Sequence, residues 1–223
     1  MCGRITLYDS PPRYAHLLGA ALGSRVDEEN WRPSWNVPPT GTLLGATLDQ
    51  DGVLVLDTYR WGLVPGWAKD LGIGNKAFNA RAETVASKPM FRSAFKRQRA
   101  VMPVSGFYEW SQDSAKQPYL FEAAGGGPLV FAGLWERWGS GDVERWTCTV
   151  ITTNAGPDMP IHHRQPVALS EDQWEPWLEP ESDPELLQGL LVPQPAGAMT
   201  HRPVGKAVGN SRADGPELIA PAD

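Results

Sequence analysis

Alternating hydrophobic and polar positions predict a chain rich in β-strands. Runs of β-branched and aromatic residues bounded by turn-forming residues occur at 53–64, 100–110, 118–123, 128–138 and 145–153, a pattern typical of strands. Helical segments are interspersed among these runs and do not alternate strictly with them. Because strict β–α alternation is the signature of a parallel sheet, the order favours an α+β fold with a largely antiparallel sheet or barrel.

Helical patterns are confined to shorter stretches of the chain. A Ser-Pro-Pro start followed by apolar residues at helical spacing predicts a helix over residues 10–21. A second helix is expected over roughly residues 82–97, and a Ser-Glu-Asp-Gln capping box beginning at Ser170 opens a third. Residues 180–200 are rich in proline and acidic side chains. We expect them to be extended and to wrap the surface without forming a separate domain.

Length and composition exclude several classes of protein. The 223 residues can form one large domain or two small ones, and 41% hydrophobic residues can build a core without a metal or disulfide staple. No apolar run approaches the length of a transmembrane helix, and no apolar signal segment is recognisable. Two cysteines without a CxxC or HExxH motif make a disulfide framework or a zinc site unexpected. We therefore expect a cytoplasmic protein that needs no metal or cofactor and has no membrane association.

A strong internal charge asymmetry lies behind the overall net charge of −6. Residues 71–104 carry seven basic residues and one acidic residue, Glu83, for a local charge of +6. The rest of the chain carries −12, much of it in residues 171–185. One positive face on an acidic protein suits a localised site for a polyanion. The alternative is an amphipathic helix whose basic side chains are simply solvated.

Cys2 is the first candidate for chemistry. Initiator methionine is normally removed before a small residue, so the mature chain is expected to begin with Cys2. The α-amine of such a residue titrates at about 7.7–8.0 and attacks an aldehyde to give a Schiff base. The adjacent thiol can then close a five-membered thiazolidine, which is favoured because the closure is intramolecular. The alternative is an incidental buried cysteine, the role we expect for Cys148 in its apolar strand.

Three further segments carry polar groups next to apolar stretches. Asn79 and Arg81 lie two residues apart and so face the same way on an extended segment. Glu109 lies between two aromatic residues at the end of an apolar run, where a carboxyl group can act as a general acid or base. His162 supplies an imidazole that can titrate near neutrality. Each also has a structural interpretation, as a turn residue, an exposed strand residue or a loop histidine.

Seven sequence blocks together resemble a known family. The blocks are, in order, MCGR, WNVPPT, WGLVPGWAKD, NARAET, GFYEW, IHHRQP and HRPVGKAVGN, and the resemblance that they carry runs from residue 2 to about residue 219. The chain is similar in these blocks to the SRAP family, the SOS response-associated peptidases or abasic site processing proteins. The resemblance implies a single compact α+β domain, residues 2–223, with a curved, largely antiparallel, barrel-like β-sheet core flanked by helices. We expect it to be a monomer.

The resemblance also implies a function in the DNA damage response. Members of the family recognise abasic sites in single-stranded DNA and trap them as a stable thiazolidine DNA–protein crosslink, which protects the lesion during replication. The implied partner is therefore single-stranded DNA containing abasic sites, with localisation at the nucleoid when bound. The implied catalytic residues are Cys2, Asn79, Glu109 and His162. The implied DNA contacts are Arg4, Trp67, Arg81, Thr152 and Arg164.

Three other functions remain open at this point. Glutamine amidotransferases of class II also begin with Met-Cys-Gly, but the Asn-Gly oxyanion segment and early arginine block that they need are not found here. A self-processing peptidase would use the same Cys2 and could be limited to removal of Met1. A non-catalytic module that binds single strands would have no use for Glu109 and His162.

Overall fold

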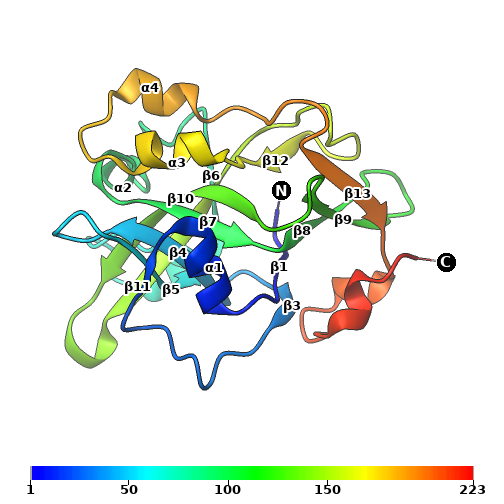
Figure 1. Ribbon diagram of the computed structural model, residues 1–223, viewed down its shortest axis with the longest axis horizontal. Helices are drawn as coiled ribbons and strands as arrows, with labels where there is room; N and C mark the ends of the chain where they lie inside the picture. The colour runs from blue at the N-terminus through cyan, green and yellow to red at the C-terminus, as the bar shows by residue number, and fades with distance from the viewer. Residues whose placement is uncertain (1, 223) are drawn as a thin grey trace.

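Two β-sheets form the frame of the protein in the computed structural model, which describes residues 2–222 (Figure 1). The strands are β1 (Ile5–Leu7), β2 (Ala21–Leu22), β3 (Ser34–Val37), β4 (Thr42–Leu48), β5 (Leu54–Trp61), β6 (Asn79–Arg81), β7 (Arg99–Val104), β8 (Gly106–Trp110), β9 (Pro118–Ala123), β10 (Leu129–Trp138), β11 (Arg145–Asn154), β12 (Arg164–Pro166) and β13 (Met199–Pro203). The α-helices are α1 (Pro11–Leu18), α2 (Arg92–Arg97), α3 (Glu171–Leu178) and α4 (Pro184–Gly189). The 3₁₀ helices are η1 (Leu71–Lys76), η2 (Gly141–Val143), η3 (Lys206–Gly209) and η4 (Pro216–Ile219).

The larger sheet closes into a barrel. Its strands β11, β10, β7, β4 and β5 follow one another as neighbours, and β5 pairs back onto β11. The β5–β11 junction is parallel, with Trp61 opposite Cys148, whereas the other four junctions are antiparallel. The expected α+β fold with a largely antiparallel, barrel-like sheet is therefore confirmed. Cys148 is fully buried, as the sequence predicted.

The second sheet packs against this barrel and contains the N-terminal strand. Its order is β13–β9–β8–β1–β3, and all of its pairings are antiparallel. Phe107 of β8 stacks on Phe121 of β9, with ring centroids 5.1 Å apart, and meets the edge of Phe131 of β10 at 5.7 Å. These rings join the two sheets, because Phe131 belongs to the barrel and the other two do not.

Two of the expected helices form where the sequence predicted them. Helix α1 begins after Ser10 and ends at Gly19, whose φ of 64° is in the left-handed region that glycine tolerates best. Helix α3 has the expected capping box, in which the Ser170 N–H donates to Gln173 Oε1 at 3.0 Å. The Trp177 indole of α3 donates to a carbonyl of β7 at 3.0 Å, which docks this helix on the barrel.

The expected helix over residues 82–97 is mostly wrong. Only residues 92–97 are α-helical, and the preceding residues form turns. Pro89 explains the late start, because it disfavours helical geometry at the residue before it and has no N–H to donate. The chain before Pro89 is also fastened to the barrel, since the Ala82 N–H donates to the carbonyl of Thr152 at 2.9 Å.

Two further expectations are corrected by the structure. The run 100–110 is not one strand, because the chain leaves the barrel at Ser105 and continues as β8 in the second sheet. Gly106 permits this crossing, since a Cβ there would lie 2.7 Å from the carbonyl of Phe121. Residues 180–200 are not extended throughout, because Asp183 caps helix α4 by accepting from two backbone N–H groups.

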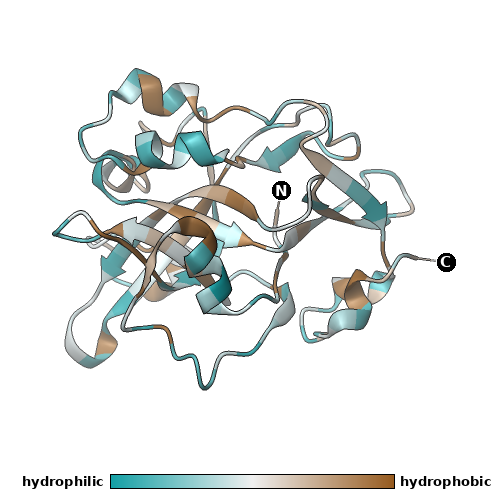
Figure 2. Cartoon of the chain, in the orientation of Figure 1, coloured by the Kyte–Doolittle hydropathy of each residue, from teal (hydrophilic) through white to brown (hydrophobic). Residues whose placement is uncertain are grey.

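The strands of the larger sheet differ in hydropathy between β10 and β12. Figure 2 shows mainly hydrophobic residues along β10 and hydrophilic residues on β12. Yet Arg164 and Gln165 of β12 are only 3% and 1% exposed. Buried polar side chains are costly unless they are hydrogen-bonded, so β12 marks a polar interior. Among residues 2–222, no helix is long and apolar enough to cross a membrane.

Candidate active site

Cys2 and Glu109 are brought together by the antiparallel pairing of β1 with β8. Ile5 lies opposite Phe107 in this ladder, so the residues that precede β1 run beside the end of β8 that carries Glu109. Cys2 is completely buried and Glu109 is 5% exposed. Figure 1 shows that β1 lies in the middle of the molecule, on the side of the second sheet that faces the barrel strands. The proposed nucleophile therefore lies in the interior of the fold, beside a carboxyl group.

Asn79 and His162 reach the same place from the barrel. Asn79 begins β6, which runs parallel to β11, and His162 lies in the loop between β11 and β12. The Asn79 side-chain amide donates a hydrogen bond to the carbonyl of Cys2 at 2.6 Å. His162 Nε2 lies 4.0 Å from Glu109 Oε1. The other three residues singled out in the sequence as catalytic thus converge on Cys2 from the two sheets.

The backbone of Arg164 holds the His162 ring in place. His162 Nδ1 lies 3.0 Å from the Arg164 backbone nitrogen and 3.1 Å from its carbonyl oxygen, and Nε2 faces Glu109. Burial lowers the pKa of His162 below its usual 6.5, and the nearby Glu109 partly opposes that shift. The imidazole is therefore mainly neutral at pH 7.

The Cys2 thiol is held in its protonated form. Burial raises its pKa strongly above the usual range, and the negative charge of Glu109 raises it further. The Sγ–H group donates a long hydrogen bond to the carbonyl of Arg4, at 3.9 Å. A reaction at this sulfur must therefore move its proton to a neighbouring group as the new bond forms.

His163 and Gln112 extend the site outward, although the sequence gave no reason to assign them a role. The His163 ring stacks on that of His162, with centroids 4.4 Å apart and planes inclined by 23°. Gln112 Nε2 lies 2.9 Å from His163 Nδ1 and orients the exposed outer ring. The doubled histidine in the IHHR block was the only sequence signal for this arrangement.

Arg4, expected to contact DNA, holds the C-terminal part of the chain. Its guanidinium donates to Asn36 Oδ1 at 3.2 Å and to the carbonyl of Val208 at 3.0 Å. The amide of Asn36, from the WNVPPT block, donates in turn to three carbonyls between residues 208 and 213. Asn36 is a structural residue that the sequence analysis did not identify, because its partners lie more than 170 positions away.

Arg164 and Thr152, two more of the expected DNA contacts, lie inside the protein. The Arg164 guanidinium forms a two-pronged ion pair with Glu83 and also donates to Asn154 Oδ1 at 3.1 Å and to the Thr152 carbonyl at 2.6 Å. The Thr152 hydroxyl donates to the carbonyl of Ala80 at 3.2 Å, and the residue has no exposed surface. In this structure both terminal nitrogens of Arg164 are used to tie β12, β11 and the segment after β6 together.

Trp67 and Arg81, the remaining expected contacts, are on the surface. Trp67 is 62% exposed, and Arg81 is also exposed, at the end of β6. Two adjacent hollows share Trp67 in their walls and have volumes of about 670 Å³ and 650 Å³. The first also reaches Asn79, so an open surface leads from the solvent toward the residue that holds Cys2.

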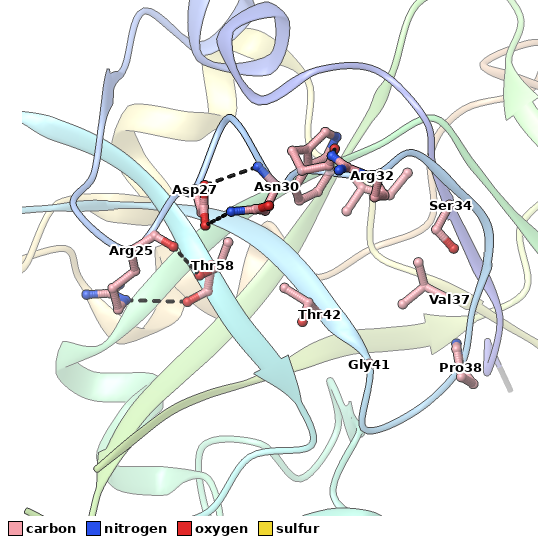
Figure 3. A pocket seen from close by; sticks show the side chains of 12 residues that line it. Arg25, Asp27, Asn30, Arg32, Ser34, Val37, Pro38, Gly41, Thr42 and Thr58 are labelled. Carbon is pink, nitrogen blue, oxygen red and sulfur yellow. Dashed lines mark hydrogen bonds between the residues drawn. The ribbon is translucent and has the colours of Figure 1, made fainter. Parts of the chain in front are cut away.

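A separate hollow lies between β1, β3, β4 and the loop that precedes β3 (Figure 3). It has a volume of about 390 Å³, and none of the nine residues singled out above lines it. Its charged groups are already partnered, since Asp27 accepts from the Asn30 side chain at 2.8 Å and Arg25 pairs with Asp57 at 3.1 Å.

Within residues 2–222, no group of three or more histidine, cysteine, aspartate or glutamate side chains is placed to hold a metal ion. The expected removal of Met1 concerns a residue outside the described part of the chain.

The chain is similar to several known proteins over nearly its whole length. The chain is 37% identical over 225 residues to the abasic site processing protein YoqW of Bacillus subtilis, which covers 98% of this chain and 99% of that protein. It is 30% identical over 231 residues to the abasic site processing protein YedK of Escherichia coli, covering 99% and 100% of the two chains. A crystal structure of a Bacteroides thetaiotaomicron protein shares the fold with a TM-score of 0.87 at 22% identity, over 99% of this chain and 100% of the other. The model of the family described as SOS response associated peptidase (SRAP) matches residues 1–211, and the chain therefore belongs to the SRAP family.

Proposed function

We propose that this protein processes abasic sites in single-stranded DNA by forming a thiazolidine crosslink through Cys2 once Met1 has been removed. The observation that carries the proposal is the convergence of Asn79, Glu109 and His162 on a buried Cys2, with the Asn79 amide 2.6 Å from the Cys2 carbonyl. The names of relatives that match nearly the whole chain support the same substrate.

The reaction needs no oxidant, reductant or cofactor. The neutral amine of Cys2 attacks the C1′ aldehyde of the ring-opened abasic sugar and forms a carbinolamine. Loss of one water gives an iminium, and the Cys2 sulfur adds to the same carbon as its proton leaves. The product is a five-membered ring, and the balance is one aldehyde and one aminothiol giving one thiazolidine and one water. The closure is fast because the thiol is already attached to the reacting nitrogen through two carbons.

Two groups divide the proton transfers between them. Glu109 lies beside the residues that precede β1, so we assign to it the protons of the Cys2 amine and of the departing water. His162 comes from the loop between β11 and β12 and presents Nε2 toward Glu109. We assign to it the proton of the sugar ring oxygen, so that it keeps the sugar in the ring-opened form. Asn79 fixes the Cys2 backbone while these steps occur. Because the thiol is held protonated, its proton must pass to one of these groups when sulfur attacks.

The iminium also allows a competing strand cleavage. A positive nitrogen at C1′ acidifies C2′, so that loss of a C2′ proton can expel the 3′ phosphate. Ring closure by the Cys2 thiol consumes the iminium and suppresses this branch. Removal of the thiol with retention of the amine should therefore convert a crosslinking protein into one that cleaves.

The direct test uses an oligonucleotide in which uracil has been excised to leave one abasic site. Wild-type protein should give a heat-stable adduct that migrates slowly on a denaturing gel, and intact mass should show that the adducted chain lacks Met1. Cys2→Ala and Cys2→Ser both keep the α-amine, so neither should give a stable adduct and both should cleave the strand. Cys2→Ser should in addition give a labile adduct. Cys148→Ala, at the other buried cysteine, is the matched control and should crosslink normally. A full yield of stable adduct from Cys2→Ala, or from protein that retains Met1, would refute the proposal.

A further inference from the structure

The hollow beneath Trp67 has an apolar floor and a basic rim. Ile73, Ala77, Met90 and Phe91 contribute the apolar surface, and its volume is about 670 Å³. Lys76 and Lys88 line the same hollow, and both are exposed. An apolar floor under a rim of cations is suited to a ligand with a flat apolar body joined to a negative charge, the chemistry of a nucleotide.

This hollow is continuous with the candidate active site. Asn79 lines its inner end and also donates the hydrogen bond to the Cys2 carbonyl. An abasic nucleotide whose C1′ reaches Cys2 has no base to place in the hollow. A neighbouring nucleotide on the same strand does have one, and it enters from the side on which Trp67 is exposed.

A second hollow gives the strand a direction in which to continue. Trp67 and Pro89 line both hollows. The rest of the second hollow is lined by residues of α2, namely Arg92, Ser93, Lys96 and Arg97. These three basic residues are exposed, and its volume is about 650 Å³. Its wall is cationic where that of the first hollow is apolar, so it suits phosphates more than a base.

From this arrangement we infer that the hollow beneath Trp67 is a nucleobase pocket that takes the base next to the lesion, on one side only, with the following phosphates lying against α2. The inference rests on the proposed function and adds to it a binding site for an intact base. Stacking on an apolar floor accepts any base, because every base has a flat face. The pocket therefore senses the presence of a neighbouring base and not its identity.

The test compares abasic oligonucleotides in which the 5′ or the 3′ neighbour of the lesion is replaced by a base-free tetrahydrofuran spacer. The DNA concentration that gives half-maximal crosslinking rate should rise by about tenfold for one of the two spacers. The other spacer should change it little. Exchanging the neighbouring base among the four natural bases should have a small effect on either side.

A comparison of two single variants locates the pocket. In Ile73→Ala the effect of the sensitive spacer should shrink, because the side chain that contacts the base has been shortened. Val53→Ala, an exposed apolar residue outside both hollows, is the matched control and should retain the full effect. Two results would overturn the inference in a protein that still crosslinks. One is the same half-maximal DNA concentration for both spacers, and the other is a spacer effect in Ile73→Ala as large as in the wild type. Loss of crosslinking with every oligonucleotide would instead refute the proposed function.

Discussion

The imidazole of His162 is tuned by three neighbours that act on different atoms. The backbone of Arg164 contacts Nδ1, Glu109 lies 4.0 Å from Nε2, and the stacked ring of His163 covers one face. Burial outweighs the carboxyl group, so the pKa is lowered and the neutral ring predominates at pH 7. This single residue shows how a loop histidine becomes part of a site through backbone and packing contacts.

The lowered pKa of His162 predicts where the crosslinking rate falls on acidification. Below pH 6.5 the ring gains a proton and pairs with Glu109, which weakens this carboxyl group as a base for the Cys2 amine, so the rate should drop in this range. His162→Ala should react more slowly and lose this drop, whereas the rise in rate that belongs to the amine, near about pH 8, should persist.

Glu109→Gln should react about 10²–10⁴-fold more slowly, since the amide cannot exchange a proton. Single-turnover rates between pH 5 and 8 measure both effects, and wild-type rates in both variants would show that Cys2 acts alone.

At the scale of elements, the connection from β5 to β6 presents Trp67. It leaves the barrel at Gly62, whose φ is 136°, and returns through η1. Gly62 and Gly74 lie back to back, and a Cβ on Gly74 would overlap the Gly62 carbonyl. A Cβ on either glycine would meet the backbone carbonyl oxygen of the other. These backbone atoms cannot swing aside, so the shape of this connection depends on the two glycines.

Gly74→Ala should therefore displace the connection and weaken DNA binding. We expect a loss of stability of about 1–3 kcal/mol from overpacking and a higher DNA concentration for half-maximal crosslinking. The maximal rate should change less, because Cys2, Glu109 and His162 belong to other elements. The control is Gly125→Ala, where a Cβ would meet no atom within 4 Å. Thermal unfolding and crosslinking at varied DNA concentration are the measurements, and identical behaviour of the two variants would contradict the argument.

At the scale of the whole molecule, the basic segment 71–104 gives an acidic protein a cationic surface. Lys88, Arg92, Lys96 and Arg97 are exposed, whereas Arg99 is buried and donates to carbonyls at the ends of α2 and α3. The charge pattern of the sequence therefore overestimates the number of cations available to DNA by at least one.

Binding to undamaged single-stranded DNA should weaken steeply with salt despite the net charge of −6. Arg81→Ala, at an exposed site, should lower the slope of log K against log salt by roughly 0.7 and leave stability unchanged. Arg164→Ala should instead destabilise the fold by about 3 kcal/mol, because it removes a buried, hydrogen-bonded ion-pair partner. Binding titrations at several salt concentrations and denaturant unfolding of both variants separate these effects. A flat salt dependence would mean that the basic segment does not face the DNA.

The local features of the fold were predictable because their causes are local. The strand at 118–123 follows from alternation, α1 from its Ser-Pro-Pro start and α3 from its capping box, each within one short window of sequence. The candidate residues at the site were found in the same way, from the position of Cys2 and from polar residues at the ends of apolar runs, and then from the family blocks. The helix over 82–97 failed because a single Pro89 outweighed the surrounding helical pattern.

What the sequence determined by itself was therefore several of the strands, the caps of α1 and α3, and a candidate for the reactive residue, since each depends on neighbours a few positions away. Only the tertiary structure decided which side chains are available for function. Arg4 and Arg164 look like surface cations in the sequence, yet one is fastened to the carbonyl of Val208 and the other to Glu83. The β11–β5 pairing that closes the barrel joins residues 148 and 61. Such contacts are set by the packing of two sheets around a buried N-terminal strand, and no local pattern encodes them.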